Sequence, residues 1–182
     1  MLERQGILVK GKNLPLIKGG KPQPAVLPNS PDLRAYTASL LERVKVVEAR
    51  KGPPKKGEDN KLSILHDGRN AALDMRLIDP SLKPDFNSKI EYAIRGILER
   101  YKTYQNVKGA QVVFIDRVAP DKTAAFNPHY YMRKKLVAGG IPDNQIAFVH
   151  DYKTDEAKDE LYEKVNDGDI RVLFGSTEKL GA

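Results

Sequence analysis

The sequence contains no cysteine and no tryptophan, and aromatic residues make up only 7% of its 182 residues. Without cysteine the chain can form neither a disulfide nor a thiolate metal site, which fits a reducing compartment and favours a cytoplasmic location. Its three histidines, His66, His129 and His150, lack the spacing of a metal site. The scarcity of aromatic side chains predicts a core made mainly of aliphatic residues.

Several sequence patterns that would identify an enzyme or a membrane protein are also absent. No apolar stretch approaches 18 residues, so the sequence predicts no membrane-spanning helix and no membrane partner. Glycine-rich phosphate loops are missing, so a complete nucleotide-hydrolysing site is not encoded and a self-contained nucleotide-binding enzyme is disfavoured. His150 and Asp155 are better explained by the end of a strand and the start of a helix than by acid–base catalysis.

Positive charge is concentrated in the first third of the chain. Residues 1–60 carry 12 Lys and Arg against 6 Asp and Glu, whereas residues 61–182 carry 19 against 18. A basic segment of this kind suggests an anionic partner, with nucleic acid first among the candidates. The alternative is that exposed loops carry lysine for solubility, and the loop that contains Lys55 and Lys56 fits this second explanation better.

The first half of the sequence predicts an irregular basic arm over residues 1–30 and a helical region over residues 31–105. Glycine and proline interrupt the arm repeatedly. Ser30 as N-cap and Pro31 at the first helical position start a helix that should end near Arg50. Further helices are predicted over residues 60–75 and from a cap at residue 87 or 88 to about residue 101.

The second half, residues 106–182, alternates between strands and helices. Strands are predicted over residues 110–115, 145–149 and 170–174, and helices over residues 128–138 and 155–166. This alternation with short links predicts an α/β fold in which a parallel sheet lies between layers of helices.

Polar residues follow each predicted strand, and the carboxyl ends of parallel strands lie along one rim of the sheet. Residues 116–117, 151–154 and 175–179 should therefore lie near one another. Backbone N–H groups, hydroxyls and cationic side chains at such a rim can bind phosphates, although every sheet of this kind also has ordinary polar turns there.

The chain ends at Ala182, inside the small-residue loop that is predicted to follow the last strand. A domain rarely ends on the residues that would carry its chemistry, so we expect a fragment of a longer protein. The edge of the final strand would then be exposed and would favour self-association.

Several segments resemble, in family order, the second RecA-like lobe of superfamily 2 helicases, nearest to the Swi/Snf-type translocases. Asn-Ser-Lys-Ile-Glu-Tyr-Ala-Ile (87–94) is similar to the Ser-x-Lys segment that introduces this lobe, and Gln-Val-Val-Phe-Ile-Asp (111–116) resembles helicase motif IV. Asp-Glu-Ala-Lys-Asp-Glu-Leu (155–161) and the strand after it are similar to the stretch that precedes motif V. Phe-Gly-Ser-Thr-Glu-Lys-Leu-Gly (174–181) resembles motif V itself.

An upstream segment makes the resemblance more specific. Asp-Gly-Arg-Asn-Ala-Ala-Leu-Asp-Met-Arg-Leu-Ile-Asp-Pro (67–80) looks like the very large helicase–DNA methylase proteins of phages, plasmids and conjugative elements. The resemblance covers about residues 62–182. It implies an ATP-dependent motor on duplex DNA, to which this chain contributes a partial second lobe.

The resemblance also implies roles for individual residues. Ser176 and Thr177 would contact DNA phosphate and sugar, and Gly181 would begin the segment that turns toward ATP. The full set of positions that would contact nucleic acid is Asp116, Arg117, Lys153, Thr154, Ser176, Thr177 and Lys179.

ATP and Mg²⁺ would bind between two lobes in the full-length protein, whereas no cofactor is expected for this chain alone. The lobe with the phosphate loop, the rest of motif V and the motif that carries the arginine finger are not within these residues, so the chain alone should not hydrolyse ATP. The expected partners are duplex DNA, the N-terminal motor lobe and a methylase domain of the same longer chain. The alternative is a non-catalytic DNA-binding or interaction module that uses the basic N-terminal region and needs no nucleotide.

Overall fold

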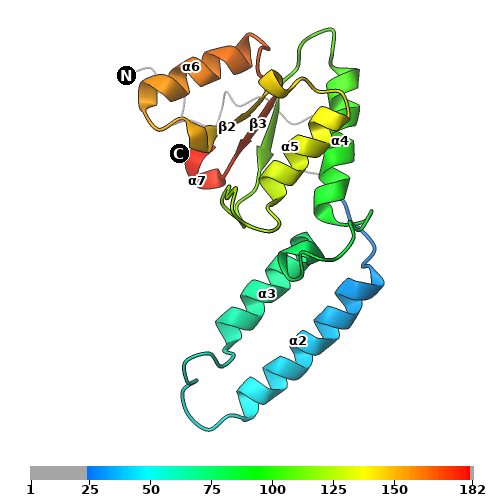
Figure 1. Cartoon of the computed structure of the whole chain (residues 1–182), viewed down its shortest axis with the longest axis vertical. Helices are drawn as coiled ribbons and strands as arrows, with labels where there is room; N and C mark the ends of the chain where they lie inside the picture. The colour runs from blue at the N-terminus through cyan, green and yellow to red at the C-terminus, as the bar shows by residue number, and fades with distance from the viewer. Residues whose placement is uncertain (1–23, 181–182) are drawn as a thin grey trace, which may run out of the picture.

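The computed structural model describes residues 24–180, in which a helical hairpin extends from a small sheet covered by helices (Figure 1). Most of the predicted irregular arm lies outside the described residues, and residues 24–30 contain neither helix nor strand. Within the described part of the chain, no helix has both the length and the apolar character needed to cross a lipid bilayer.

Two helices, α2 (Pro31–Ala49) and α3 (Lys61–Leu73), form the hairpin. Each helix starts at a residue whose side chain accepts hydrogen bonds from backbone N–H groups of the first turn: Ser30 caps α2, and Asn60 caps α3. The predicted helix over residues 31–50 is therefore confirmed, together with the physical reason for its start.

The hairpin is held by an ion-pair network and by a close contact between its helices. The guanidinium group of Arg43 lies 2.7 Å from Asp59 and 2.8 Å from Asp67. Hydrogen bonds to these two carboxylates raise the pKa of Arg43. A Cβ atom added to Gly68 would lie 3.3 Å from Leu40 Cδ1, so the glycine allows α3 to approach α2 closely.

The hairpin leads through a short 3₁₀ turn, η1 (Met75–Leu77), to helix α4 (Lys89–Thr103). Of the two predicted caps, the structure uses Ser88, whose hydroxyl accepts a hydrogen bond from the N–H of Glu91 at 3.2 Å. The apolar face of α4 carries Ile90, Ile94 and Ile97, all of which are buried in the core shared with the sheet.

The sheet consists of three parallel strands, β1 (Gln111–Phe114), β2 (Ile146–Phe148) and β3 (Val172–Gly175), in the order β1-β3-β2. The expectation that the final strand lies at an edge is wrong, because β3 pairs with both other strands. Every residue of β3 is buried, as expected for the central strand of a parallel sheet. The exposed edge belongs to β1 instead.

Helices cover both faces of the sheet (Figure 1). One face packs on α4 and α5 (Pro128–Ala138), whose side chains share a core with β3. The other face packs on α6 (Asp155–Asn166) and α7 (Thr177–Leu180). Two 3₁₀ turns, η2 (Asp143–Gln145) and η3 (Val149–Asp151), flank β2. The predicted α/β fold with a parallel sheet is thus confirmed, but a helical turn replaces the loop predicted after the last strand.

A buried arginine joins the hairpin to the sheet-covering helices. The side chain of Arg76 in η1 is only 5% exposed, and its Nη2 lies 2.7 Å from Asp74 and 3.3 Å from Glu91 of α4. Its guanidinium carbon lies 4.4 Å from the ring centre of Phe126 and 4.1 Å from that of Tyr131 in α5. The Tyr131 hydroxyl donates a hydrogen bond to Glu91. Burial and this hydrogen bond raise the pKa of Tyr131.

Replacing this arginine should therefore destabilise the whole described unit. We expect Arg76→Ala to lower the free energy of unfolding by about 3–5 kcal/mol, because the buried Asp74 and Glu91 would lose their positive partner. Lys61→Ala, which removes an exposed ion pair with Glu48, should cost less than about 1 kcal/mol. Urea unfolding followed by circular dichroism measures both values. Equal values for the two variants would contradict the central role of Arg76.

Candidate functional site

The three strands end along one rim of the sheet. From this rim, the connections after β1 and β3 lead to opposite faces of the sheet. The connection after β1 leads to α5, whose Met132 and Leu136 pack on one face of the sheet. The turn after β3 leads to α7, whose Leu180 packs on the other face. β1 and β3 are neighbours, so the space between their carboxyl ends is the point of the sheet where α/β proteins commonly bind ligands.

Asp116 and Thr177 meet across this point. The carboxylate of Asp116, two residues after β1, accepts the backbone N–H of Thr177 at 2.6 Å and its hydroxyl at 2.8 Å. The first of these bonds satisfies the N–H of the first residue of α7, which has no partner within the helix. The N–H and then the hydroxyl of Thr177 hold the pKa of Asp116 below its usual value.

The turn between β3 and α7 depends on a glycine that leaves no room for a side chain. A Cβ atom at Gly175 would lie 2.3 Å from Leu180 Cδ1 and 2.9 Å from Val149 Cγ1. Ser176 follows, and its hydroxyl accepts a hydrogen bond from the N–H of Lys179 at 3.3 Å. The side chains of Thr177 and Lys179 remain exposed to solvent. The rim therefore presents hydroxyl groups and one ammonium group on a turn fixed by packing.

Arg117 and its neighbour Asp116 line the same pocket but have different hydrogen-bond partners. The Nε of Arg117 donates a hydrogen bond to Asn70 of α3 at 3.2 Å. Arg117 lines a pocket of about 370 Å³ together with Lys89 and apolar side chains of α4, α5 and β1. The sequence predicted that Asp116 and Arg117 act together at the polar end of one strand. In the structure, Asp116 bonds to Thr177 of α7, whereas Arg117 bonds to Asn70 of the hairpin.

Lys153 and Thr154 follow β2, beyond the 3₁₀ turn η3. The hydroxyl of Thr154 accepts the N–H of Ala157 at 3.2 Å and so caps α6. Within residues 24–180, no hydrogen bond or ion pair joins either residue to the pair formed by Asp116 and Thr177. Both side chains are exposed. Gly181, the residue predicted to face a nucleotide, lies outside the described residues.

Two histidines near the rim, His129 buried and His150 partly buried, form a pair that was not singled out by the sequence. His129 lies in the first turn of α5 and is fully buried, and its Nε2 lies 2.7 Å from the carbonyl oxygen of Val118. Its ring centre lies 6.1 Å from that of His150 in η3. The Nδ1 atoms of both rings are buried without a hydrogen-bond partner. Burial lowers the pKa of His129, and the neighbouring His150 adds to this effect. No local spacing signals the pair, because 20 intervening residues and one strand separate the two positions.

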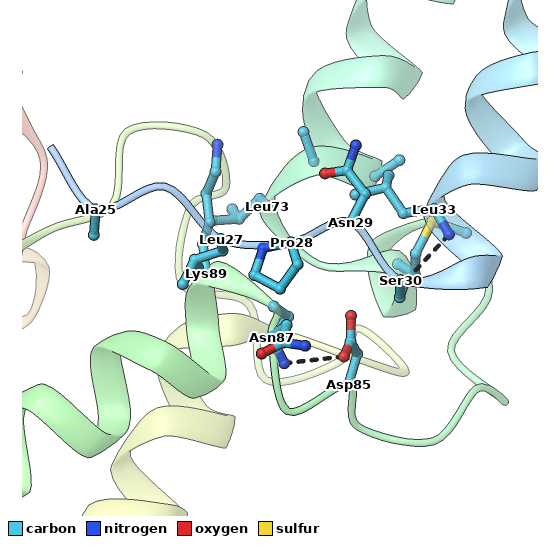
Figure 2. A pocket seen from close by; sticks show the side chains of 14 residues that line it. Ala25, Leu27, Pro28, Asn29, Ser30, Leu33, Leu73, Asp85, Asn87 and Lys89 are labelled. Atoms are coloured by element: carbon cyan, nitrogen blue, oxygen red, sulfur yellow. Dashed lines mark hydrogen bonds between the residues drawn. The ribbon is translucent and has the colours of Figure 1, made fainter.

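A further pocket lies at the joint between the hairpin and the sheet unit, as Figure 2 shows. Its volume is only about 80 Å³, and Leu27 and Pro28 lie across it. Some polar groups in its wall are already paired: the N–H of Asn87 donates to Asp85 at 2.9 Å, and Ser30 caps α2. This pocket is a packing joint, and the rim between β1 and β3 remains the better candidate.

Comparison of the chain with protein-family models, with curated proteins and with solved structures gave no match. The candidate site is therefore defined by its geometry alone. The described residues contain no group of three or more His, Cys, Asp and Glu side chains arranged to hold a metal ion.

The hydrogen bonds at the rim predict a specific change in the titration of Asp116. Thr177→Val removes the hydroxyl but keeps the N–H, so the pKa of Asp116 should rise part of the way to its usual value. A carboxylate whose pKa is lowered on folding adds stability above its unfolded pKa of about 3.9, and this stability is lost as the pH falls through the folded value. The variant should therefore lose less stability on acidification. ¹³C NMR titration of the carboxyl carbon measures the change.

Asp121 and Thr123 supply a matched control for this measurement. Asp121 accepts the N–H of Thr123 at 2.8 Å and its hydroxyl at 2.7 Å, and its pKa is lowered by the same two contacts. Thr123→Val should raise the pKa of Asp121 and leave that of Asp116 unchanged. An Asp116 pKa that is the same in Thr177→Val and in the unchanged protein would contradict the contact across the rim.

Proposed function

We propose that the chain is part of the second motor lobe of a cytoplasmic ATP-dependent DNA helicase or translocase associated with DNA methylation. The observation that carries the proposal is the contact between Asp116 and Thr177, which lies between the carboxyl ends of the neighbouring parallel strands β1 and β3. The segment that resembles helicase motif IV ends in Asp116, and the segment that resembles motif V contains Thr177. Their contact at the carboxyl rim supports a shared binding surface.

The chemistry of the rim suits the backbone of duplex DNA. The hydroxyl of Thr177 already donates to Asp116, so the groups that can donate at the rim are the Ser176 hydroxyl and the exposed ammonium groups of Lys153 and Lys179 on neighbouring turns. Such donors bind phosphate oxygens without reading base sequence, which is what a motor that moves along DNA requires. In this proposal the Asp116 carboxylate is a positioning group, because it fixes the turn that carries Ser176 and Thr177.

ATP and Mg²⁺ enter the proposal only through a second lobe of a longer protein. In residues 24–180 the rim carboxylate Asp116 is already engaged by Thr177, and no carboxylate cluster suited to a metal ion lies nearby. In this proposal the described residues do not hold the nucleotide themselves. Their own part is to bind the DNA backbone and to hold the turn after β3 in place.

A second candidate function is a non-catalytic DNA-binding module that uses the tip of the hairpin. Lys51, Lys55 and Lys56 lie in the exposed loop between α2 and α3, at the far end of the hairpin (Figure 1). Within the described ranges, none of their ammonium groups forms an ion pair. The distance of this loop from the rim makes the two candidate surfaces separable by mutation.

Two double variants with the same change in charge separate these functions. Lys153→Ala with Lys179→Ala removes two cations from the rim, and Lys55→Ala with Lys56→Ala removes two from the hairpin tip. If the rim binds DNA, the first pair should weaken binding to a fluorescent duplex by about tenfold and lower the salt slope by about 2, because each lost phosphate contact lowers it by roughly 1. The second pair should change both quantities much less.

The opposite ranking, with the hairpin pair dominant, would support the DNA-binding module instead. A single hydroxyl variant tests the rim further. Ser176→Ala leaves the charge unchanged and should weaken binding by a few-fold, because a typical hydrogen bond contributes about 0.5–1.5 kcal/mol net. Failure of the purified chain to bind duplex DNA at low salt would contradict both functions.

A further inference from the structure

Among the described residues, strand β1 has a free edge on the side away from β3. The N–H groups of Gln111 and Ile115 donate to the carbonyl oxygens of Arg171 and Gly175, each at 2.9 Å. Alternate residues of a parallel strand direct their backbone groups to the same side. The N–H and C=O groups of Val112 and Phe114 therefore point away from β3, and within residues 24–180 no strand lies there to pair with them.

The two edges of the sheet differ in how they are covered. In β2, Ile146 and Phe148 are only 4% and 1% exposed, so neighbouring segments cover that edge. In β1, Val112 is 49% and Phe114 is 53% exposed. Natural proteins usually protect an edge strand with charged residues, proline or a bulge, and none of these occurs within Gln111–Phe114. The edge of β1 is thus open and apolar.

Apolar grooves run along both faces of this edge. On one face a groove of about 430 Å³ lies between β1 and α4, with Tyr92 and Ile97 in its wall. On the other face a groove of about 340 Å³ lies beside Val112 and Phe114, with Tyr162 and Leu180 in its wall. A strand added to β1 would direct alternate side chains into the two grooves, so it would need apolar residues on both of its faces.

Cationic side chains stand at both ends of the edge. Arg100 lines the groove at the start of β1, near Gln111. Lys89 and Arg117 line the adjoining pocket at the end of β1 together with Asp116, whose carboxylate is bonded to Thr177, so two cations and one carboxylate line this pocket. In the described part of the chain none of the three cations forms an ion pair with a carboxylate. A second copy of this chain, which carries a net charge of +7, would bring like charges together at this edge. A strand with acidic residues at both ends would be complementary instead.

We propose that the open edge of β1 binds an extended segment of a partner polypeptide as an added strand. The segment has about four consecutive apolar residues, matching the length of β1, and acidic residues before and after them. Backbone hydrogen bonds to Val112 and Phe114 supply affinity, and the grooves and flanking cations supply selectivity. This interaction is independent of the DNA-binding function proposed above.

The test uses the whole chain and a fluorescent synthetic peptide, Glu-Asp-Val-Ile-Val-Val-Asp-Glu, acetylated and amidated at its ends. Saturable binding is expected, measured by fluorescence anisotropy. A peptide with lysine in place of the four acidic residues should bind at least about tenfold more weakly, because the cations would repel it. Amide hydrogen exchange should show new protection at Val112 and Phe114, with Gln111 and Val113 unchanged, because the latter already bond to β3.

Two substitutions at one position separate backbone pairing from side-chain contact. Val112→Pro removes an N–H that points to the open edge and is not used by β3, so the fold should survive and peptide affinity should fall at least about tenfold. Val112→Thr keeps the N–H and the β-branched shape, and its affinity should stay within about twofold. Circular dichroism checks that each variant is folded. If the proline variant is unfolded, the amide hydrogen exchange of the unchanged protein tests the proposal instead, through the protection of Val112 and Phe114 on peptide binding.

A third substitution tests the flanking charges. Arg100→Glu should weaken binding of the acidic peptide several-fold and strengthen binding of the lysine peptide. Three results would overturn the proposal: equal affinity for both peptides, full affinity in a folded Val112→Pro variant, or a dimer in sedimentation analysis that Val112→Pro dissociates. The last result would assign the edge to a second copy of this chain.

Discussion

A buried guanidinium group fixes how the parts of this molecule sit together. Arg76 packs against the rings of Phe126 and Tyr131 and is paired with Asp74 and Glu91. Because a buried charge without its partner is costly, η1, α4 and α5 cannot separate without exposing or orphaning one of these groups. The hairpin therefore extends from the sheet unit at a fixed joint, and α4 is held against one face of the sheet.

The placement of α4 has consequences on both sides of β1. It leaves the free edge of the strand beside an apolar groove that contains Arg100. It also places the pocket lined by Lys89 and Arg117 next to the carboxyl rim. The rim itself is fixed from the opposite face, where α7 packs through Leu180 and is joined to Asp116 by Thr177. The proposed DNA-binding surface and the proposed strand-binding edge are thus adjacent but use different chemical groups.

Much of the local structure could be predicted from the sequence, because its causes lie within a few residues. The start of α2 follows from Ser30 and Pro31, and the helix over 128–138 was predicted with the bounds that the structure has. The three strands were predicted within about two residues, since short apolar runs between turns leave few alternatives. The parallel sheet followed from the alternation of strands and helices. The contact between residues at the rim followed from that topology, without a prediction of which residues would meet.

The order of the strands and the partners of polar side chains were decided only by the tertiary structure. β3 lies in the centre of the sheet, and both of its faces are apolar and covered. Its sequence of four residues does not show whether it occupies a central or an edge position. Arg76 contacts Glu91 and Tyr131, which lie 15 and 55 residues away along the chain, and is buried. His129 is buried through contacts between separate elements. No local sequence pattern encodes such contacts. The sequence determined where helices and strands begin, through caps and apolar runs; packing determined which of their polar residues face one another, because that depends on contacts between distant segments.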